Sequence, residues 1–167
     1  CKAQNGRGRR WQHDKVVASI VRFAKQQDLV AYNTPVSLKD PNSDLQPDGL
    51  ICLHDCDLVF DVAGVDPLAP TYLKRNAKNP LAAEHDAATP FVYNLLGGLH
   101  TSADKLLLRI IASNHRVPNC LHRQKLHEIR TELAISIQRD NANIIRACFN
   151  YASGRAQSDP MIFLDDC

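Results

Sequence analysis

Apolar residues recur at three- and four-residue spacing in the first part of the chain, starting just after Asp14. This period is that of one face of a helix, so we predict a helix with Asp14 as its cap that ends in the polar run 25–28. The same period predicts helices over residues 102–113 and 119–152, the second with a break near Asp140. The apolar positions of the first and last patterns are Val16, Val17, Ile20, Val21 and Ala24, and Leu126, Ile129, Leu133 and Ile137.

Four other segments lack the helical period and are predicted to be strands. Residues 29–38 alternate weakly, two apolar runs flank residues 54–57, and residues 89–96 precede the turn Gly97-Gly98. Three prolines interrupt the connection before the last strand and leave room only for a short helix over 81–88. This order predicts an α/β fold of the α+β type, a mixed sheet of about four strands flanked by helices, with a long C-terminal helical region.

Two aspartates lie in the runs around residues 54–57. Asp48 begins the first run, and Asp61 lies inside the second, which is predicted as one strand from Leu58 to Val65. Residues 54–57 indicate a tight turn between antiparallel strands. With an even-numbered loop, Leu50 faces Asp61, so the two acids are diagonal neighbours on one face, about 7 to 8 Å apart. Two carboxylates so placed can bind one cation, whereas an odd-numbered loop would place them on opposite faces.

The sequence around Asp61 indicates a metal site more strongly than the sequence around Asp48 does. Asp61 lies between Phe60 and Val62 in an otherwise apolar run. A buried carboxylate costs several kcal/mol unless a cation, a donor or a proton compensates it. Taken alone, Asp48 is equally consistent with an ordinary turn residue at the start of a strand. A metal site and a pair of structural, hydrogen-bonded aspartates are therefore both open.

The composition fits one globular domain. The 167 residues are 44% hydrophobic, enough for a sizeable core, and no apolar run is long enough to cross a membrane. The net charge of +2 is too small to indicate a nucleic-acid partner, but basic residues crowd the start of the chain. This basic arm, residues 1–12 with Lys15 just after it, either contacts phosphates or is a solvated flank. Its basic residues are Lys2, Arg7, Arg9, Arg10 and Lys15.

The start of the chain and its cysteines indicate what kind of protein it belongs to and its redox environment. The chain begins with Cys1 rather than Met and shows no signal-peptide pattern, which predicts a piece of a longer protein. Six cysteines without a CxxC pair or regular spacing predict an intracellular, reduced protein rather than a disulfide framework. A zinc site is an alternative, but it needs two distant segments to meet. It would combine Cys52, His54 or Cys56 with His115, Cys120 or His122.

Pro47-Asp48, twelve further residues and then Asp61 resemble the PD-(D/E)xK nuclease signature. In that signature two acids on adjacent strands bind Mg²⁺, and a Lys two residues after the second acid helps to orient the attacking water. Further segments, in order over roughly residues 10 to 150, resemble the restriction-like endonuclease domain at the C-terminal end of non-long-terminal-repeat retrotransposon polyproteins. They are WQHDKVV (11–17), QPD (46–48), DVAGVDP (61–67), PFVYNLLGGL (90–99) and LAISIQRDNANIIR (133–146).

The resemblance implies a restriction-endonuclease-like domain over residues 13–152, followed by a flexible tail over 153–167. It implies an enzyme that holds Mg²⁺ or Mn²⁺ on Asp48 and Asp61 and nicks target DNA, so that the exposed 3′ end primes reverse transcription. The implied partners are DNA and a reverse transcriptase domain of the same polyprotein, in an intracellular, nuclear location. Because such domains often follow a zinc knuckle, Cys1 would be the last ligand of a truncated knuckle.

The chain departs from the family at the catalytic lysine. Ala63 occupies the expected position, and the predicted helix over 81–88 contains no Lys. Lys74 and Lys78 are the nearest substitutes, and both also suit solvated surface lysines. A catalytically decayed copy that folds and binds DNA without cutting it is therefore the alternative. His13, near the predicted helix start, is interpreted as a cap-region residue rather than a catalyst.

Overall fold

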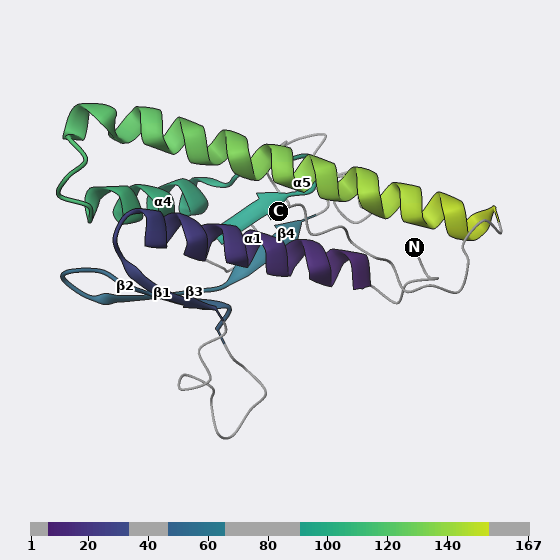
Figure 1. Cartoon of the computed structure of the whole chain (residues 1–167), viewed down its shortest axis with the longest axis horizontal. Coiled ribbons are helices and arrows are strands. Elements are labelled where there is room, and N and C mark those ends of the chain that lie inside the picture. The colour runs from purple at the N-terminus through teal and green to yellow at the C-terminus, as the bar shows by residue number, and fades with distance from the viewer. Residues whose placement is uncertain (1–6, 34–46, 66–90, 154–167) are drawn as a thin grey trace, which may run out of the picture.

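The computed structural model describes residues 7–33, 47–65 and 91–153 (Figure 1). The order of elements in these residues agrees with the predicted α+β class, and none of their helices has the length and apolar content to cross a membrane. Cys1, Lys74, Lys78, the predicted helix over 81–88 and the tail from residue 154 lie outside the described residues. The elements are α1 (Arg7–Gln26), β1 (Val30–Asn33), β2 (Gly49–Cys52), β3 (Asp57–Phe60), β4 (Val62–Val65), β5 (Phe91–Asn94), α4 (Thr101–Ala112), the 3₁₀ helix η3 (Asn119–Leu121) and α5 (His122–Ala152).

The described strands form two small sheets, so the prediction of one mixed sheet of about four strands is wrong. Strands β1, β2 and β3 pair antiparallel in that order, and β4 pairs with β5 in parallel. The single strand predicted over 58–65 is divided at Asp61, because Phe60 pairs with β2 whereas Val62 pairs with β5. Phe60 and Val62 are both buried on either side of Asp61. The two-residue alternation therefore continues across the division and gives no sign of it.

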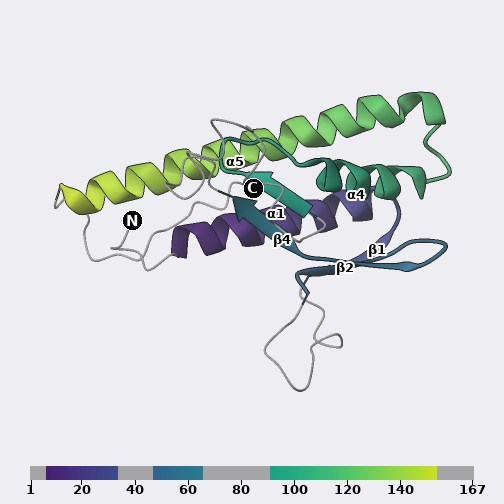
Figure 2. The same ribbon diagram turned by 180° about the vertical axis from the view of Figure 1, so that it is seen from behind.

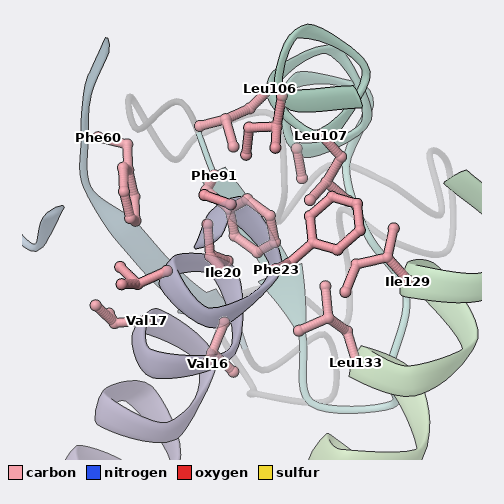
Figure 3. Close-up of a cluster of buried hydrophobic side chains, with 14 of the residues drawn as sticks. Val16, Val17, Ile20, Phe23, Phe60, Phe91, Leu106, Leu107, Ile129 and Leu133 are labelled. Carbon is pink, nitrogen blue, oxygen red and sulfur yellow. The ribbon is translucent and has the colours of Figure 1, made fainter. Parts of the chain in front are cut away.

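Helix α1 lies between the antiparallel sheet and α5, and both views of the molecule show this layering (Figures 1 and 2). Side chains from the helices and from both sheets meet in one hydrophobic core. Within it, Phe23 of α1 lies among Leu107 of α4 and Ile129 and Leu133 of α5 (Figure 3). A fully buried side chain of this kind contributes about 1.5–3 kcal/mol. The apolar face predicted for α1 thus holds this helix against the sheets.

Helix α1 begins at Arg7, earlier than the start predicted at Asp14. Its first turns are anchored on α5 by the buried side chain of Gln12. The Gln12 amide nitrogen donates to the backbone carbonyl of Ile137 at 3.2 Å and to Oδ1 of Asn141 at 3.0 Å. Because these tertiary contacts extend the helix beyond its apolar pattern, the basic arm predicted over residues 1–12 is helical from Arg7 onwards.

Helix α5 continues without a break through Asp140, where a break was predicted. Asp140 is buried, with Oδ1 lying 3.7 Å from Nζ of Lys15 on α1. The next residue, Asn141, donates its side-chain amide to the backbone carbonyl of Leu95, just after β5. The polar residues that suggested a break are instead contacts between α5 and its neighbours, so tertiary packing overrides their weak helix propensity.

Candidate functional site

The two aspartates lie next to each other at the end of the β2–β3 hairpin. The last pair of its ladder is Gly49 with Phe60, and Asp48 and Asp61 are the residues just beyond that pair. The loop contains residues 53–56, an even number, which meets the condition set for placing both acids on one face, and the amide of Leu53 donates to the carbonyl of Cys56 across it. The predicted register is wrong by two residues, since Leu50 faces Val59 rather than Asp61. The acids are therefore direct neighbours rather than diagonal ones.

Gly49 explains how Asp48 reaches this position. A Cβ atom at Gly49 would lie closer than 3.0 Å to the ring of Phe60, a separation that real Cβ atoms essentially never show. The absence of a side chain lets the Phe60 ring lie over the strand, where it is buried in the core. The Asp48-Gly49 pair thus combines a carboxylate at the strand start with the space that the opposite aromatic ring needs.

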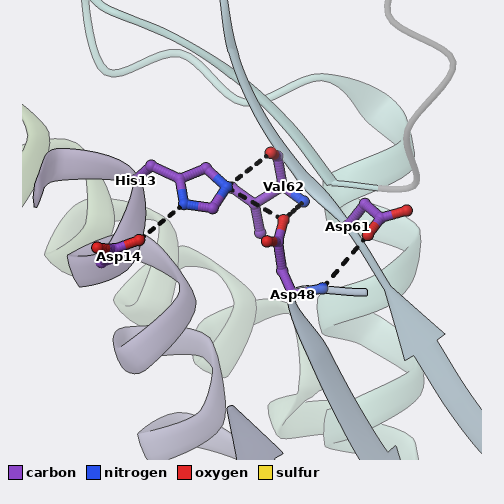
Figure 4. A network of polar contacts seen from close by, with 5 residues as sticks. All are labelled: His13, Asp14, Asp48, Asp61 and Val62. Atoms are coloured by element: carbon purple, nitrogen blue, oxygen red, sulfur yellow. Dashed lines mark hydrogen bonds and ion pairs between the residues drawn. The ribbon is translucent and has the colours of Figure 1, made fainter. Parts of the chain in front are cut away.

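Asp48 connects the two sheets and helix α1 (Figure 4). Its Oδ2 atom accepts a hydrogen bond from the backbone amide of Val62 in β4 at 2.7 Å. The same oxygen lies 3.1 Å from Nε2 of His13 in α1. The backbone amide of Asp48 donates to Oδ1 of Asp61 at 3.3 Å. Asp48 is therefore held by the protein at the point where the chain passes from the antiparallel sheet to the parallel pair.

Asp61 differs from its predicted state, because it is exposed rather than buried. In Figure 4 its carboxylate points away from α1, whereas the Asp48 carboxylate points towards His13 on that helix. The prediction of a shared face required the two carboxylates to converge on one point, and they do not. The cause is the change of sheet at Asp61, which ends the ladder before this pair. An ion shared by both acids requires rotation of the exposed Asp61 side chain.

His13 belongs to this site, a role that the interpretation as a cap-region residue missed. Because α1 begins at Arg7, His13 lies inside the helix rather than at its cap. Its Nε2 also contacts the carbonyl of Val62 at 3.1 Å. The sequence held a signal for this placement, because His13 precedes Val17 and Ile20 by four and seven residues. Those two side chains are buried in the core, so the helical period turns His13 towards the sheets as well.

The contacts of His13 favour its doubly protonated form. Nδ1 lies 3.2 Å from Oδ1 of Asp14, and Nε2 faces Asp48 and the Val62 carbonyl, so both ring nitrogens face only acceptors. A neutral imidazole can donate from only one nitrogen. Partial burial opposes the charge, but the hydrogen bonds and charges of Asp14 and Asp48 outweigh it and raise the pKa of His13 above its ordinary value of 6.5. In its protonated form His13 places a positive charge beside Asp48.

The basic residues predicted to contact DNA also lie on α1. Arg9 and Arg10 are exposed in its first turns, and the side chain of Arg7 lies outside the described set. Lys15 is engaged within the protein, since its Nζ lies 3.7 Å from Asp140 and 4.0 Å from the ring centroid of Trp11. Lys15 is therefore a weaker candidate for phosphate contact than the exposed Arg10.

A second polar group lies where α1, α5 and β5 meet. Burial raises the pKa of the Tyr93 hydroxyl to about 12, with the charge of Arg9 opposing this shift and that of Asp140 adding to it. Burial likewise raises the pKa of Asp140, against the charges of Lys15 and Arg139. Tyr93 is consequently protonated at neutral pH and serves as part of the core.

The segments required for the alternative zinc site do meet. The imidazole rings of His54 and His115 stack with centroids 4.8 Å apart and an angle of 18°, and Cys56 Sγ accepts a hydrogen bond from Arg109 Nη2 at 3.0 Å. Stacked rings direct their lone pairs into separate planes rather than towards one point. Within residues 7–33, 47–65 and 91–153, no group of three or more His, Cys, Asp or Glu side chains could hold a metal ion. The zinc site is therefore not supported there.

No protein-family model, no curated protein and no solved structure matches this chain. The function therefore has to be argued from the geometry of the site and from the motifs of the sequence.

Proposed function

We propose that this chain is a divalent-metal-dependent DNA endonuclease domain of a retrotransposon polyprotein, which nicks target DNA to prime reverse transcription in the nucleus. The observation that carries the proposal is the placement of Asp48 and Asp61. They are adjacent where the antiparallel hairpin passes into the parallel pair β4–β5, and α1 lies alongside. The described order of elements, a helix, three antiparallel strands, a parallel pair of strands and further helices, is compatible with an α+β domain of this kind and supports the proposal.

The two carboxylates are donors of the type that suits Mg²⁺ or Mn²⁺, and they can share one ion once the exposed Asp61 side chain rotates. Mg²⁺ is commonly held by one or two carboxylates, with waters and substrate phosphates completing its shell, so a third protein ligand is not needed. Asp48 and Asp61 supply hard oxygen ligands of this kind. A bound ion would activate water for attack and stabilise negative charge on the scissile phosphate. The protein's own part is to fix Asp48 through Val62 and His13, and to present Asp61 on an exposed turn of the chain.

The basic start of α1 supports DNA as the substrate. Arg9 and Arg10 are exposed on the same helix that carries His13, so the helix that contacts the acids also presents positive charge. Arginines bind backbone phosphates through charge-assisted hydrogen bonds without reading sequence. We assign the DNA-positioning role to these residues, together with Arg7 and, less strongly, Lys15.

A second candidate is a DNA-binding domain that does not cleave, and one observation favours it. His13 and the Val62 amide already hold Asp48 without a metal ion, while the Asp61 carboxylate points elsewhere. Position 63, where the nuclease signature has its lysine, is Ala63. The substitutes Lys74 and Lys78 would have to supply the missing lysine in the first candidate and are not needed in the second.

Nicking of supercoiled plasmid with Mn²⁺ separates the two candidates. The first predicts that the wild-type chain nicks and that Asp61→Asn does not, because the variant keeps the shape of the side chain but removes its charge. Asp55→Asn is the matched control, since Asp55 is an exposed acid in the loop of the same hairpin and should leave nicking unchanged. DNA binding without nicking by the wild-type chain would favour the second candidate. Equal nicking by wild type and Asp61→Asn would overturn the role of Asp61.

A further inference from the structure

We propose that His13 is a positioning residue of the metal site, which fixes one oxygen of Asp48 so that the other oxygen stays available to the ion. This inference rests on the proposed function. It assigns a role to a residue that comes from a helix far from both acids in the sequence. His13 lies 35 residues before Asp48.

The distribution of contacts on the two acids supports this role. The hydrogen bonds that described residues make to the Asp48 carboxylate both fall on Oδ2, from the Val62 amide at 2.7 Å and from His13 at 3.1 Å. Among the described residues, the hydrogen bond to the Asp61 carboxylate comes from the Asp48 amide and falls on Oδ1 of Asp61. As far as the described residues are concerned, the second oxygen of each acid therefore accepts no hydrogen bond and can face a ligand. Partners that hold one oxygen of a metal-binding carboxylate in this way orient the ligand and tune its affinity.

His13 is itself held rigidly enough to orient Asp48. Its Nδ1 is bound by Asp14 at 3.2 Å, and its backbone belongs to the turn of α1 that the buried Gln12 ties to α5. The imidazole side chain is 29% exposed and the Asp48 side chain 25%, so their contact is sheltered without being closed to a ligand. The chain Asp14–His13–Asp48 is therefore a preorganised support that holds Oδ2 of Asp48 and leaves its other oxygen to the ion.

The two amide substitutions at position 13 form a matched test. Gln places its side-chain nitrogen near the position of Nε2, whereas the shorter Asn places it near Nδ1 and does not reach Asp48. The measurement is Mn²⁺ affinity from the electron paramagnetic resonance signal of free Mn²⁺. We expect His13→Asn to weaken binding by about 10–100-fold, the usual effect of removing such a support, and His13→Gln to retain most of the affinity. His54→Asn, an exposed histidine of the hairpin loop, is the control and should bind as the wild type does.

A second readout separates positioning from general loss of structure. If His13 only orients Asp48, His13→Asn raises the Mn²⁺ concentration required for half-maximal nicking, and saturating Mn²⁺ restores the rate. Equal Mn²⁺ affinity of the wild type, His13→Gln and His13→Asn would overturn the role of His13 and leave the proposed function standing. Absence of Mn²⁺ binding by the wild-type chain would overturn the proposed function itself.

Discussion

Substitution of Gly49 by Ala tests whether packing inside the hairpin sets the position of Asp48. A methyl group at this position would meet the Phe60 ring at less than 3.0 Å, whereas ordinary contacts begin near 3.4 Å. The ring must therefore move, but Phe60 is only 1% exposed and is surrounded by core side chains. Overpacking of this kind costs about 1–3 kcal/mol. Replacing Gly by Ala recovers about 0.4–1 kcal/mol through the unfolded chain, so we expect a net loss of about 1–2 kcal/mol.

Urea denaturation followed by circular dichroism measures this loss as a lower midpoint at unchanged slope. The decisive comparison is a double-mutant cycle with Phe60→Leu, which removes the ring that the methyl group would meet. We expect the double variant to be more stable than the sum of the two single effects by about 1 kcal/mol, because the clash is absent. Simple additivity, or a Gly49→Ala chain as stable as the wild type, would refute the reasoning from the Phe60 contact.

The same substitution has a functional consequence. Asp48 directly precedes Gly49, and a shift of the strand moves its carboxylate away from the Val62 amide. We therefore expect Gly49→Ala to weaken Mn²⁺ binding and Phe60→Leu to restore part of it in the double variant. A loss of stability without any change in affinity would show that the hairpin end adjusts independently of the Phe60 contact.

Two further predictions concern α1. Changing Arg7, Arg9 and Arg10 together to Ala should weaken DNA binding and lower the slope of log affinity against log salt by up to about three, near 0.9 for each phosphate that is no longer neutralised; an unchanged slope would mean that these residues are a solvated flank. The raised pKa of His13 predicts stabilisation that is fully present below about pH 6.5 and is lost as the pH rises through the folded-state pKa. Urea denaturation across this range should show that fall in the wild type and not in His13→Gln, and equal pH profiles of the two chains would contradict the ion pairs of His13 with Asp14 and Asp48.

The sequence by itself determined most of the local structure, because periodicity is a property of neighbouring residues. The apolar spacing from Val16 onwards identified the face that α1 buries, and the spacing of Ile129, Leu133 and Ile137 did the same for α5. The hairpin itself was also predictable, since two apolar runs flank a short polar turn, but the sequence left open whether its loop is even- or odd-numbered. Given an even-numbered loop, the neighbouring positions of Asp48 and Asp61 follow, although the predicted register was wrong by two residues.

Only the tertiary structure decided how the site is built. The division of one apolar run between two sheets at Asp61 depends on a pairing with β5, some thirty residues later, and alternation is the same on both sides of the division. That division separates the two carboxylates, which a continuous strand would have kept on one face. The contact of His13 with Asp48 arises because the core packs α1 against both sheets. Spacing along the chain determines which face of an element is buried, but the packing of distant elements determines which polar groups meet.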